Sequence, residues 1–186
     1  MAIRTIREVG DDVLRKTAKP VEQVTPAILN LLDDMLETLV DIGGAGLAAP
    51  QVGILRRVAI INIPDEDAFY EMINPEITEA GELKEDIEGC LSIKGMAGLV
   101  NRPKYVKVKA FDRNFEPYEI EAEGFVAIAI CHELDHLDGV LYTDKATRMM
   151  EVDSPEYFDY LDSEERKENG SKSAKRRAAR ARKTAE

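Results

Sequence analysis

The chain has 186 residues, of which 44% are hydrophobic and 33% charged, and its formal net charge is −11 at pH 7. This balance is ordinary for a soluble globular protein that buries one core. No stretch approaches the roughly 20 apolar residues that cross a bilayer, and two cysteines exclude a disulfide framework. The first residues, MAIRTIREVGDD, lack the apolar core of a signal peptide, so we expect a cytoplasmic protein with no membrane partner.

The first predicted element is an amphipathic α-helix that begins after Thr25, the N-cap, with Pro26 at the first helical position. The pair Gly43-Gly44 ends it. Apolar residues recur at helical spacing between these ends: Ile28, Leu31, Leu32, Met35, Leu36, Leu39 and Val40. We expect this stripe to pack against the core.

Short buried strands are predicted at residues 57–64 and 70–77. The alternating run at 105–120, interrupted by DRN, predicts a β-hairpin with one solvent-exposed face. After Gly124, the apolar run FVAIAICHELDHL predicts a buried helix that closes at Gly139. Strands followed by a buried helix, without βαβ alternation, indicate an α+β fold with antiparallel or mixed sheets.

The chain divides into three predicted parts: a folded domain at 1–150, a C-terminal helix and polar linker at 151–170, and a basic tail at 171–186. The helix begins at Ser154-Pro155. Residues 172–183 hold seven basic residues and no acid, while the remaining 18 Lys and Arg face 36 Asp and Glu. The acidic body would repel nucleic acid, whereas the tail would attract it and stay unpacked unless a partner is present.

Both histidines of the chain, His132 and His136, lie in the segment HELDH around Glu133. On a helix, positions four apart share a face, so both imidazoles can bind one ion. Glu133 lies about 100° further round, at the rim of that site. This pattern recurs in zinc peptidases, with the glutamate as general base. The alternative is a pair of half-exposed helix histidines, which the buried context disfavours because neutral rings in a core need partners.

A catalytic metal site needs a third protein ligand and an open position. The chain has no further histidine, and the acids downstream of HELDH stand in no convincing arrangement. Cys131 is rotated about 100° from His132 on the helix, so it points away from the ion and is expected to be a small buried thiol. The candidate that remains is Cys90, in the segment EGCLS.

Three segments together resemble the signature segments of the peptide deformylases: GAGLAAPQ (44–51), EGCLS (88–92) and HELDH (132–136). The resemblance spans about residues 3 to 147, including VLRKTAKPVE, INPEI and HLDGVLYTD. Two positions depart from the family pattern: Cys131 stands where glutamine is frequent, and Lys94 where proline is frequent. The resemblance implies an α+β fold with the HELDH helix at its centre.

The resemblance also implies a metal-dependent hydrolase. Cys90 would bind as thiolate and His132 and His136 as neutral imidazoles, around one Fe²⁺ per chain with Zn²⁺ or Ni²⁺ as substitutes. Glu133 would take a proton from the attacking water and deliver it to the departing amine. The side-chain amide of Gln51 and the backbone N–H of Leu91 would stabilise the developing oxyanion.

The implied substrate is the N-formylmethionyl end of newly synthesised proteins, from which formate is released. Three glycines would let the peptide backbone approach closely: Gly44, Gly46 and Gly89. A thioether side chain needs an apolar slot. Three residues on the helix before the histidines are candidates for its lining, with ordinary core packing as the alternative: Phe125, Ile128 and Ala129.

Asp135 and Arg102 also match the family pattern. They are compatible with a supporting pair near the site, or with a solvated salt bridge elsewhere. Arg102 is expected at a strand start, because it precedes a proline. Some members of the family dock on ribosomes through a C-terminal segment, so a contact between the basic tail and ribosomal RNA is expected by analogy. A nuclear-type signal and a solvated end are the alternatives for the tail.

Two other functions stay open. An HExxH peptidase would cleave internal bonds of unformylated peptides, and a cysteine as third ligand argues against it. A non-enzymatic relative would bind RNA without the tail. The joint presence of the three candidate ligands, Glu133 and Gln51 argues against that second alternative.

Overall fold

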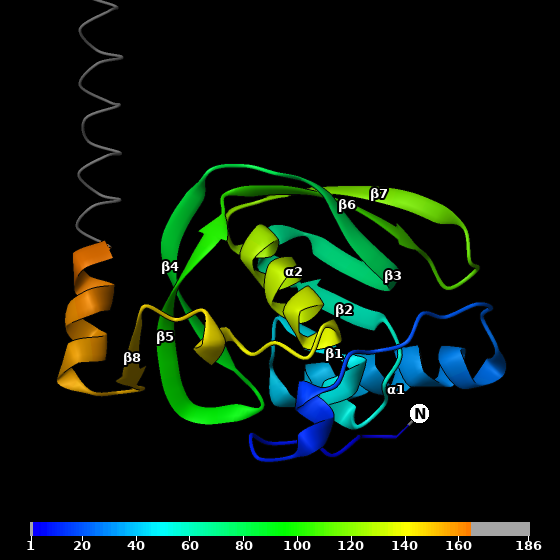
Figure 1. Ribbon diagram of the computed structural model, residues 1–186, viewed down its shortest axis with the longest axis horizontal. Helices are drawn as coiled ribbons and strands as arrows, with labels where there is room; N and C mark the ends of the chain where they lie inside the picture. Colours follow the sequence, from blue (N-terminus) through cyan, green and yellow to red (C-terminus); the bar gives the residue numbers. More distant parts are fainter. Residues whose placement is uncertain (1, 165–186) are drawn as a thin grey trace, which may run out of the picture.

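Residues 2–164 are described by the computed structural model, and they form two antiparallel sheets with helices between and beside them (Figure 1). The predicted basic tail and residues 165–170 of the predicted linker lie outside the described residues. All pairs between the named strands are antiparallel. The predicted α+β class is therefore confirmed, with antiparallel sheets.

The five-stranded sheet has the order β1-β2-β3-β6-β7, with strand bounds of Gly46–Ala48, Val58–Ile63, Ala68–Ala80, Tyr105–Phe111 and Pro117–Glu123. The three-stranded sheet has the order β4-β5-β8, with bounds of Leu83–Cys90, Ile93–Pro103 and Arg148–Glu151. The α-helices are α1 (Pro26–Ile42) and α2 (Gly124–Leu137), and residues 155–164 are also helical. Short 3₁₀ turns occupy Asp12–Arg15 (η1), Ala49–Val52 (η2), Pro64–Glu66 (η3) and Tyr142–Asp144 (η4).

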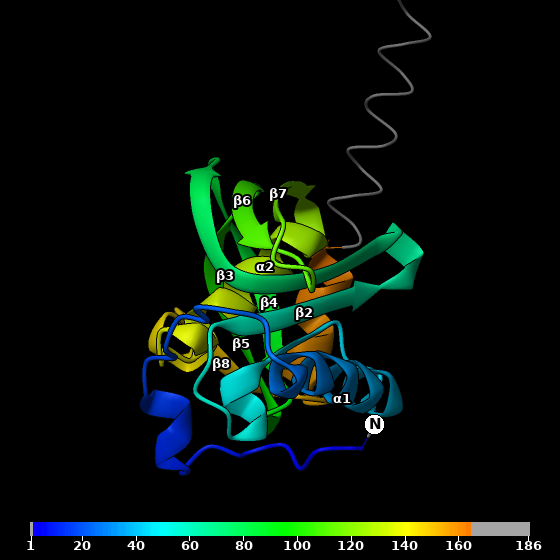
Figure 2. The ribbon, with the colours of Figure 1, turned by 90° about the vertical axis from the view of Figure 1, so that its right-hand side faces the viewer.

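Strand β2 lies between the two α-helices, which explains why its sequence is almost entirely apolar. Ala59 and Ile61 belong to the hydrophobic cluster that includes α2, whereas Val58 and Ile60 belong to the cluster that includes α1. Successive side chains on a strand point to opposite faces, so α1 and α2 cover opposite faces of this sheet. Figure 2 shows the two helices on either side of β2.

Helix α2 is buried between the five-stranded sheet and the strands β4 and β5 (Figure 1). Its apolar side chains pack against β2, β3, β6 and β7 in one cluster. The face that carries the histidines turns instead toward β4 and β5. No helix in residues 2–164 has the length and apolar content that crossing a bilayer requires.

Several predicted elements are present with altered details. Val40 is 61% exposed, so its place in the buried stripe of α1 was wrong: it is rotated about 100° from Leu39, away from the sheet. The predicted strand at 70–77 is the middle of the longer β3, where the register shifts between Ile73 and Glu76. Arg102 lies near the end of β5 and not at a strand start. The hairpin of β4 and β5 was not predicted.

Candidate metal centre

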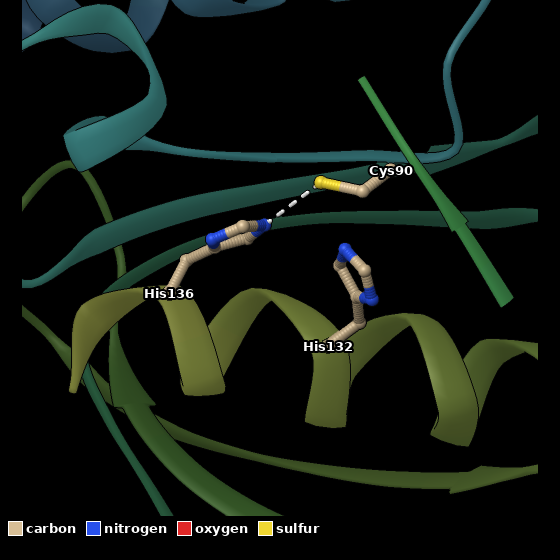
Figure 3. Close-up of side chains that lie close together, drawn as sticks. All are labelled: Cys90, His132 and His136. Atoms are coloured by element: carbon tan, nitrogen blue, oxygen red, sulfur yellow. Dashed lines mark hydrogen bonds between the residues drawn. The ribbon is translucent and has the colours of Figure 1, made fainter. Parts of the chain in front are cut away.

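Three side chains from two elements meet in the interior: Cys90 from the end of β4, and His132 and His136 from α2 (Figure 3). One ligand atom from each lies within 4.8 Å of the others. The Nε2 atom of His136 is 3.3 Å from the Cys90 sulfur. The two rings are nearly perpendicular, with centroids 4.9 Å apart. The structure thus brings together the residues that the sequence predicts as metal ligands.

A buried carboxylate lies behind the first histidine. The Nδ1 atom of His132 donates to Oε2 of Glu88 over 2.7 Å, and both side chains are buried. This hydrogen bond places the proton on Nδ1 and leaves Nε2 free to face Cys90. Glu88 belongs to the EGCLS segment, but the sequence did not predict it as a hydrogen-bond partner of His132.

Glu88 is in turn held by a buried arginine. The guanidinium of Arg102 donates to both oxygens of Glu88, over 2.5 and 3.0 Å, and to Asp135 over 2.7 Å. Lys145 reaches the other oxygen of Asp135, at 2.6 Å. Burial raises the pKa of Glu88, but the hydrogen bonds from His132 and Arg102 outweigh it and lower that pKa below its usual value. Asp135 and Arg102 are therefore a supporting pair next to the site and not a solvated salt bridge elsewhere.

The donor set fits a divalent transition metal. One thiolate and two imidazoles are ligands for Zn²⁺ and for Fe²⁺. Burial lowers the pKa of His132, but hydrogen bonds with Cys90 and Glu88 raise it to about 10. Burial and the nearby His132 lower the pKa of His136 to about 3. A cation bound among the three ligand atoms needs His132 in its neutral form, so the metal and a proton compete for this ring.

Glu133 lies beside this group with one oxygen unpaired. It is buried, and its Oε2 atom has no hydrogen-bond partner among residues 2–164. Burial raises its pKa to about 7. A carboxylate that is buried and lacks a partner is costly unless a ligand or solvent satisfies it. The unpaired oxygen therefore indicates that Glu133 contacts a reacting group beside the three candidate ligands.

The glycine of β1 makes room for Glu133. A Cβ atom on Gly46 would lie 2.6 Å from Oε1 of Glu133 and 2.8 Å from its Cγ atom. At Gly44, a Cβ atom would lie 2.8 Å from Leu39 and 3.1 Å from Leu91. Both glycines were predicted to admit a substrate backbone, and both line the pocket described below. At Gly89 the nearest atom would be 3.9 Å away, which leaves room for a substrate.

Gln51 lies in η2, buried, with its amide turned toward Cys90. Its Oε1 atom accepts from the N–H of Ala48 over 2.8 Å. Its Nε2 atom is 3.3 Å from Oγ of Ser92 and 3.6 Å from the sulfur of Cys90. Leu91 and Ser92 form the two-residue turn between β4 and β5, since Cys90 pairs with Ile93. The side-chain amide and the Leu91 backbone therefore flank the same cysteine.

A pocket of about 370 Å³ opens beside these groups. It includes eleven of the predicted site residues, together with Glu88 and others that the sequence did not indicate. Its predicted lining is Gly44, Gly46, Gly89, Gln51, Leu91, Phe125, Ile128, Ala129, His132, Glu133 and Cys90. The further apolar lining is Ala45, Ile87, Ile93, Met96 and Val152. Phe125 is 53% exposed, which places it at the mouth and not in the core.

The two positions that depart from the family pattern lie on different sides of α2. Lys94 belongs to the bulge 94–96, which lines the pocket, and its ammonium pairs with Glu8 at 2.6 Å. Cys131 is buried and lines a separate hollow with Leu134 and Asp135. Burial raises the pKa of the Cys131 thiol to about 11. Cys131 is not part of the ligand group, as its position on the helix predicts.

Comparison with known proteins gives one consistent family. The family model described as "Polypeptide deformylase" matches residues 3–152. The peptide deformylase of Lachnoclostridium phytofermentans is 54% identical over 146 residues, covering 78% of this chain and 90% of that protein. The peptide deformylase of Acetivibrio thermocellus is 51% identical over 156 residues, covering 84% and 91%.

Comparison with solved structures gives the same family. The crystal structure of the peptide deformylase from Thermotoga maritima is 39% identical with a TM-score of 0.75, covering 80% of this chain and all of that one (100%). The enzyme from Synechococcus elongatus in complex with actinonin is 40% identical with a TM-score of 0.73, covering 77% of this chain and 78% of that one.

Proposed function

The chain belongs to the peptide deformylase family and removes the formyl group from newly synthesised peptides, and we propose that it does so with one Fe²⁺ held by Cys90, His132 and His136. The observation that carries this proposal is the group of three ligand atoms within 4.8 Å of one another, beside the unpaired oxygen of Glu133. Zn²⁺ and Ni²⁺ are the proposed substitutes, since the same donors accept them.

When bound, the ion supplies Lewis-acid chemistry, which makes the formyl carbonyl more electrophilic and water more acidic. The protein's part is to hold the ligands in the correct form. Glu88 fixes the Nδ1 tautomer of His132, and the buried Arg102 keeps Glu88 ionised. Such outer partners make the ligand more basic and orient its ring.

Glu133 is the proposed general base and acid. Its unpaired Oε2 atom accepts a proton from the water that attacks the formyl carbon, and the same atom delivers that proton to the departing amine nitrogen. Burial supports this role, because it raises the pKa of Glu133 to about 7, close to the pH at which both steps must occur. Gly46 lets the side chain lie against β1 in that position.

Gln51 and Leu91 are the proposed donors to the developing oxyanion. The Nε2 atom of Gln51 faces the cysteine sulfur, and Leu91 follows that cysteine in the chain. Donors fixed before the reaction stabilise the charge without reorganising. The Gln51 side chain is oriented before substrate arrives, because its Oε1 atom accepts from the N–H of Ala48.

The pocket supports selection of a formylated methionine. Phe125, Ile128 and Ala129 line it from α2, with Ile87 and Met96 from the opposite strands. A thioether fits such an apolar lining. Gly89 leaves room for the peptide backbone, whereas Gly44 and Gly46 shape the wall. A formyl group is smaller than any other acyl group, so a tight site excludes the acetylated chain.

The remaining proposals concern the whole chain. We assign residues 1–150 to the catalytic domain, with the helix after Ser154 as an addition to it. The basic tail lies outside the described residues, and a contact with ribosomal RNA in the cytoplasm is proposed from its charge and by analogy with family members that dock on ribosomes through a C-terminal segment. Deletion of residues 171–186 should weaken ribosome binding in a salt-dependent manner and leave hydrolysis of a short peptide unchanged.

The identity of the metal is tested by purification without oxygen followed by elemental analysis. We expect about one iron per chain, since one group of three ligands is present. Exposure to air should abolish formate release by the iron form, because ferrous iron beside a thiolate is oxidised. The nickel form should stay active over the same time. Zinc alone after anaerobic purification, with full activity, would contradict the assignment of iron.

A further inference from the structure

Two backbone hydrogen bonds join the N-terminal segment to the two loops that flank Cys90. The N–H of Arg7 donates to the carbonyl of Gln51 over 2.7 Å, and the N–H of Val9 donates to the carbonyl of Ser92 over 2.8 Å. Residues 7–9, here called the N-terminal strap, therefore hydrogen-bond to both loops.

The two loops come from different sheets. Gln51 lies in η2, between β1 and β2 of the five-stranded sheet, whereas Ser92 lies in the turn between β4 and β5 of the three-stranded sheet. These loops carry the proposed donors to the oxyanion, the Gln51 amide and the Leu91 N–H. The distance between the donors thus depends on how the two sheets are held together at this point.

Side chains of the strap add further contacts on both loops. Glu8 pairs with Lys94, three residues beyond Leu91, at 2.6 Å. The side chain of Arg7 lies over Gly53, where a Cβ atom would be 3.0 Å from its Nε atom. The ion pair is exposed on both sides and contributes little by itself. The backbone hydrogen bonds are therefore the main contacts.

The amide of Gln51 needs such a support. Its Nε2 atom touches Ser92 and Cys90, and it must leave those partners to donate to a substrate oxygen. The backbone of Gln51 then has to be held by something other than its own side chain. The N–H of Arg7 provides that hold, directly at the Gln51 carbonyl.

We propose that the N-terminal strap is a positioning element for the oxyanion donors, acting through Arg7 on Gln51 and through Val9 on the Leu91–Ser92 turn. The inference rests on the proposed function of Gln51 and Leu91. Residues 7–9 are neither in the lining of the pocket nor in the group of metal ligands. Its loss should therefore lower kcat, because misplaced donors stabilise the transition state less, and leave KM and metal retention unchanged.

Amide-to-ester exchange tests the strap one hydrogen bond at a time. The α-hydroxy acid of arginine at position 7, or of valine at position 9, removes the N–H and keeps the side chain. The matched control is the same exchange at Arg4, whose N–H donates over 2.9 Å to Thr38 on α1, away from the donors. For each protein, kcat and KM on a formyl-Met peptide, the rate of metal loss to a chelator, and Tm are measured.

We expect the esters at 7 and 9 to lower kcat by about 5- to 20-fold, with KM and the rate of metal loss unchanged. The ester at 4 should lower Tm by a similar amount but leave kcat unchanged. In a Gln51→Ala background, the ester at 7 should have less than about a twofold effect, because the group that it positions is gone. Equal kcat in all three esters, or an undiminished effect in the Gln51→Ala background, would overturn the inference. Formate release by the unmodified protein separates that outcome from failure of the proposed function, which would overturn both.

Discussion

The Oε2 atom of Glu88 lies 2.7 Å from the Nδ1 atom of His132, and Glu88 is two residues before Cys90 on β4. Residues two apart on a strand share a face, so β4 supplies one metal ligand and the support of another. The remaining ligand, His136, lies one turn after His132 on α2. The geometry of the site is therefore set by one strand placed against one helix.

Replacing Glu88 with glutamine should weaken metal binding. The variant keeps an oxygen near His132 but loses the charge, and it leaves Arg102 with less compensation in a buried position. We expect metal affinity to fall by about 10- to 100-fold, measured by competition with a chelator. Glu85→Gln on the same strand is the control, because Glu85 accepts only a surface contact from Thr147 in the described hydrogen bonds. Equal affinities in the two variants would contradict the support role.

Replacing Glu133 with glutamine should abolish proton transfer without removing the metal. Glu133 is not among the three ligand groups, and its Oε2 atom is unpaired. Loss of a general base lowers kcat by about 10²- to 10⁴-fold. Steady-state kinetics and metal content are measured on the same preparation. A variant that turned over normally would remove Glu133 from the mechanism.

Two glycines of the pocket should respond differently to alanine. In Gly46→Ala, the added carbon would lie 2.6 Å from the Glu133 oxygen, so the base must move and kcat should fall about 10-fold or more. In Gly89→Ala, the added carbon has 3.9 Å of space in the protein but would meet the substrate backbone, so KM should rise. The two variants are compared by kcat and KM on one peptide. The reverse pattern would show that the substrate lies along β1 and not along β4.

The turn between β6 and β7 gives a prediction on stability and pH. The N–H groups of Glu116 and Asn114 hold the pKa of Asp112 below its usual value of 3.8. A lowered folded-state pKa means that the carboxylate stabilises the fold above its unfolded pKa, and that this contribution disappears as the pH falls through the folded pKa. Asp112→Ala should therefore lower Tm at about pH 6, with a difference that shrinks below about pH 4. A Tm difference independent of pH would contradict this account, and hydrolysis should be unaffected.

The fold class and two of its helices follow from local patterns in the sequence. Apolar residues at helical spacing and a proline at the first helical position predict α1, and a long apolar run predicts that α2 is buried. The hairpin of β4 and β5 has no such pattern. Leu83–Cys90 contains four charged residues before its glycine. Ile93–Pro103 is interrupted by glycines and by the bulge at 94–96. Its strands are recognised only through their pairing.

Site residues that are close in the sequence could be predicted from it. Contacts that depend on strand pairing or on packing between distant segments could not. His132 and His136 are one helical turn apart, so their shared face follows from the sequence. Glu88 on β4 contacts Arg102 on β5, and it contacts His132, which is 44 residues away in the sequence. No local sequence pattern predicts these contacts. The close packing of Glu133 against Gly46 likewise depends on the tertiary structure. The roles of Gln51 and Leu91 remain predictions.

The measurement that tests the central claim most directly is release of formate from a short formyl-Met peptide by protein purified without oxygen and loaded with Fe²⁺. The acetyl-Met peptide and an unformylated peptide with internal bonds are measured beside it. We predict rapid release from the formyl peptide alone, and no cleavage of the other two. No release by correctly metallated protein, or cleavage of internal bonds, would contradict the account.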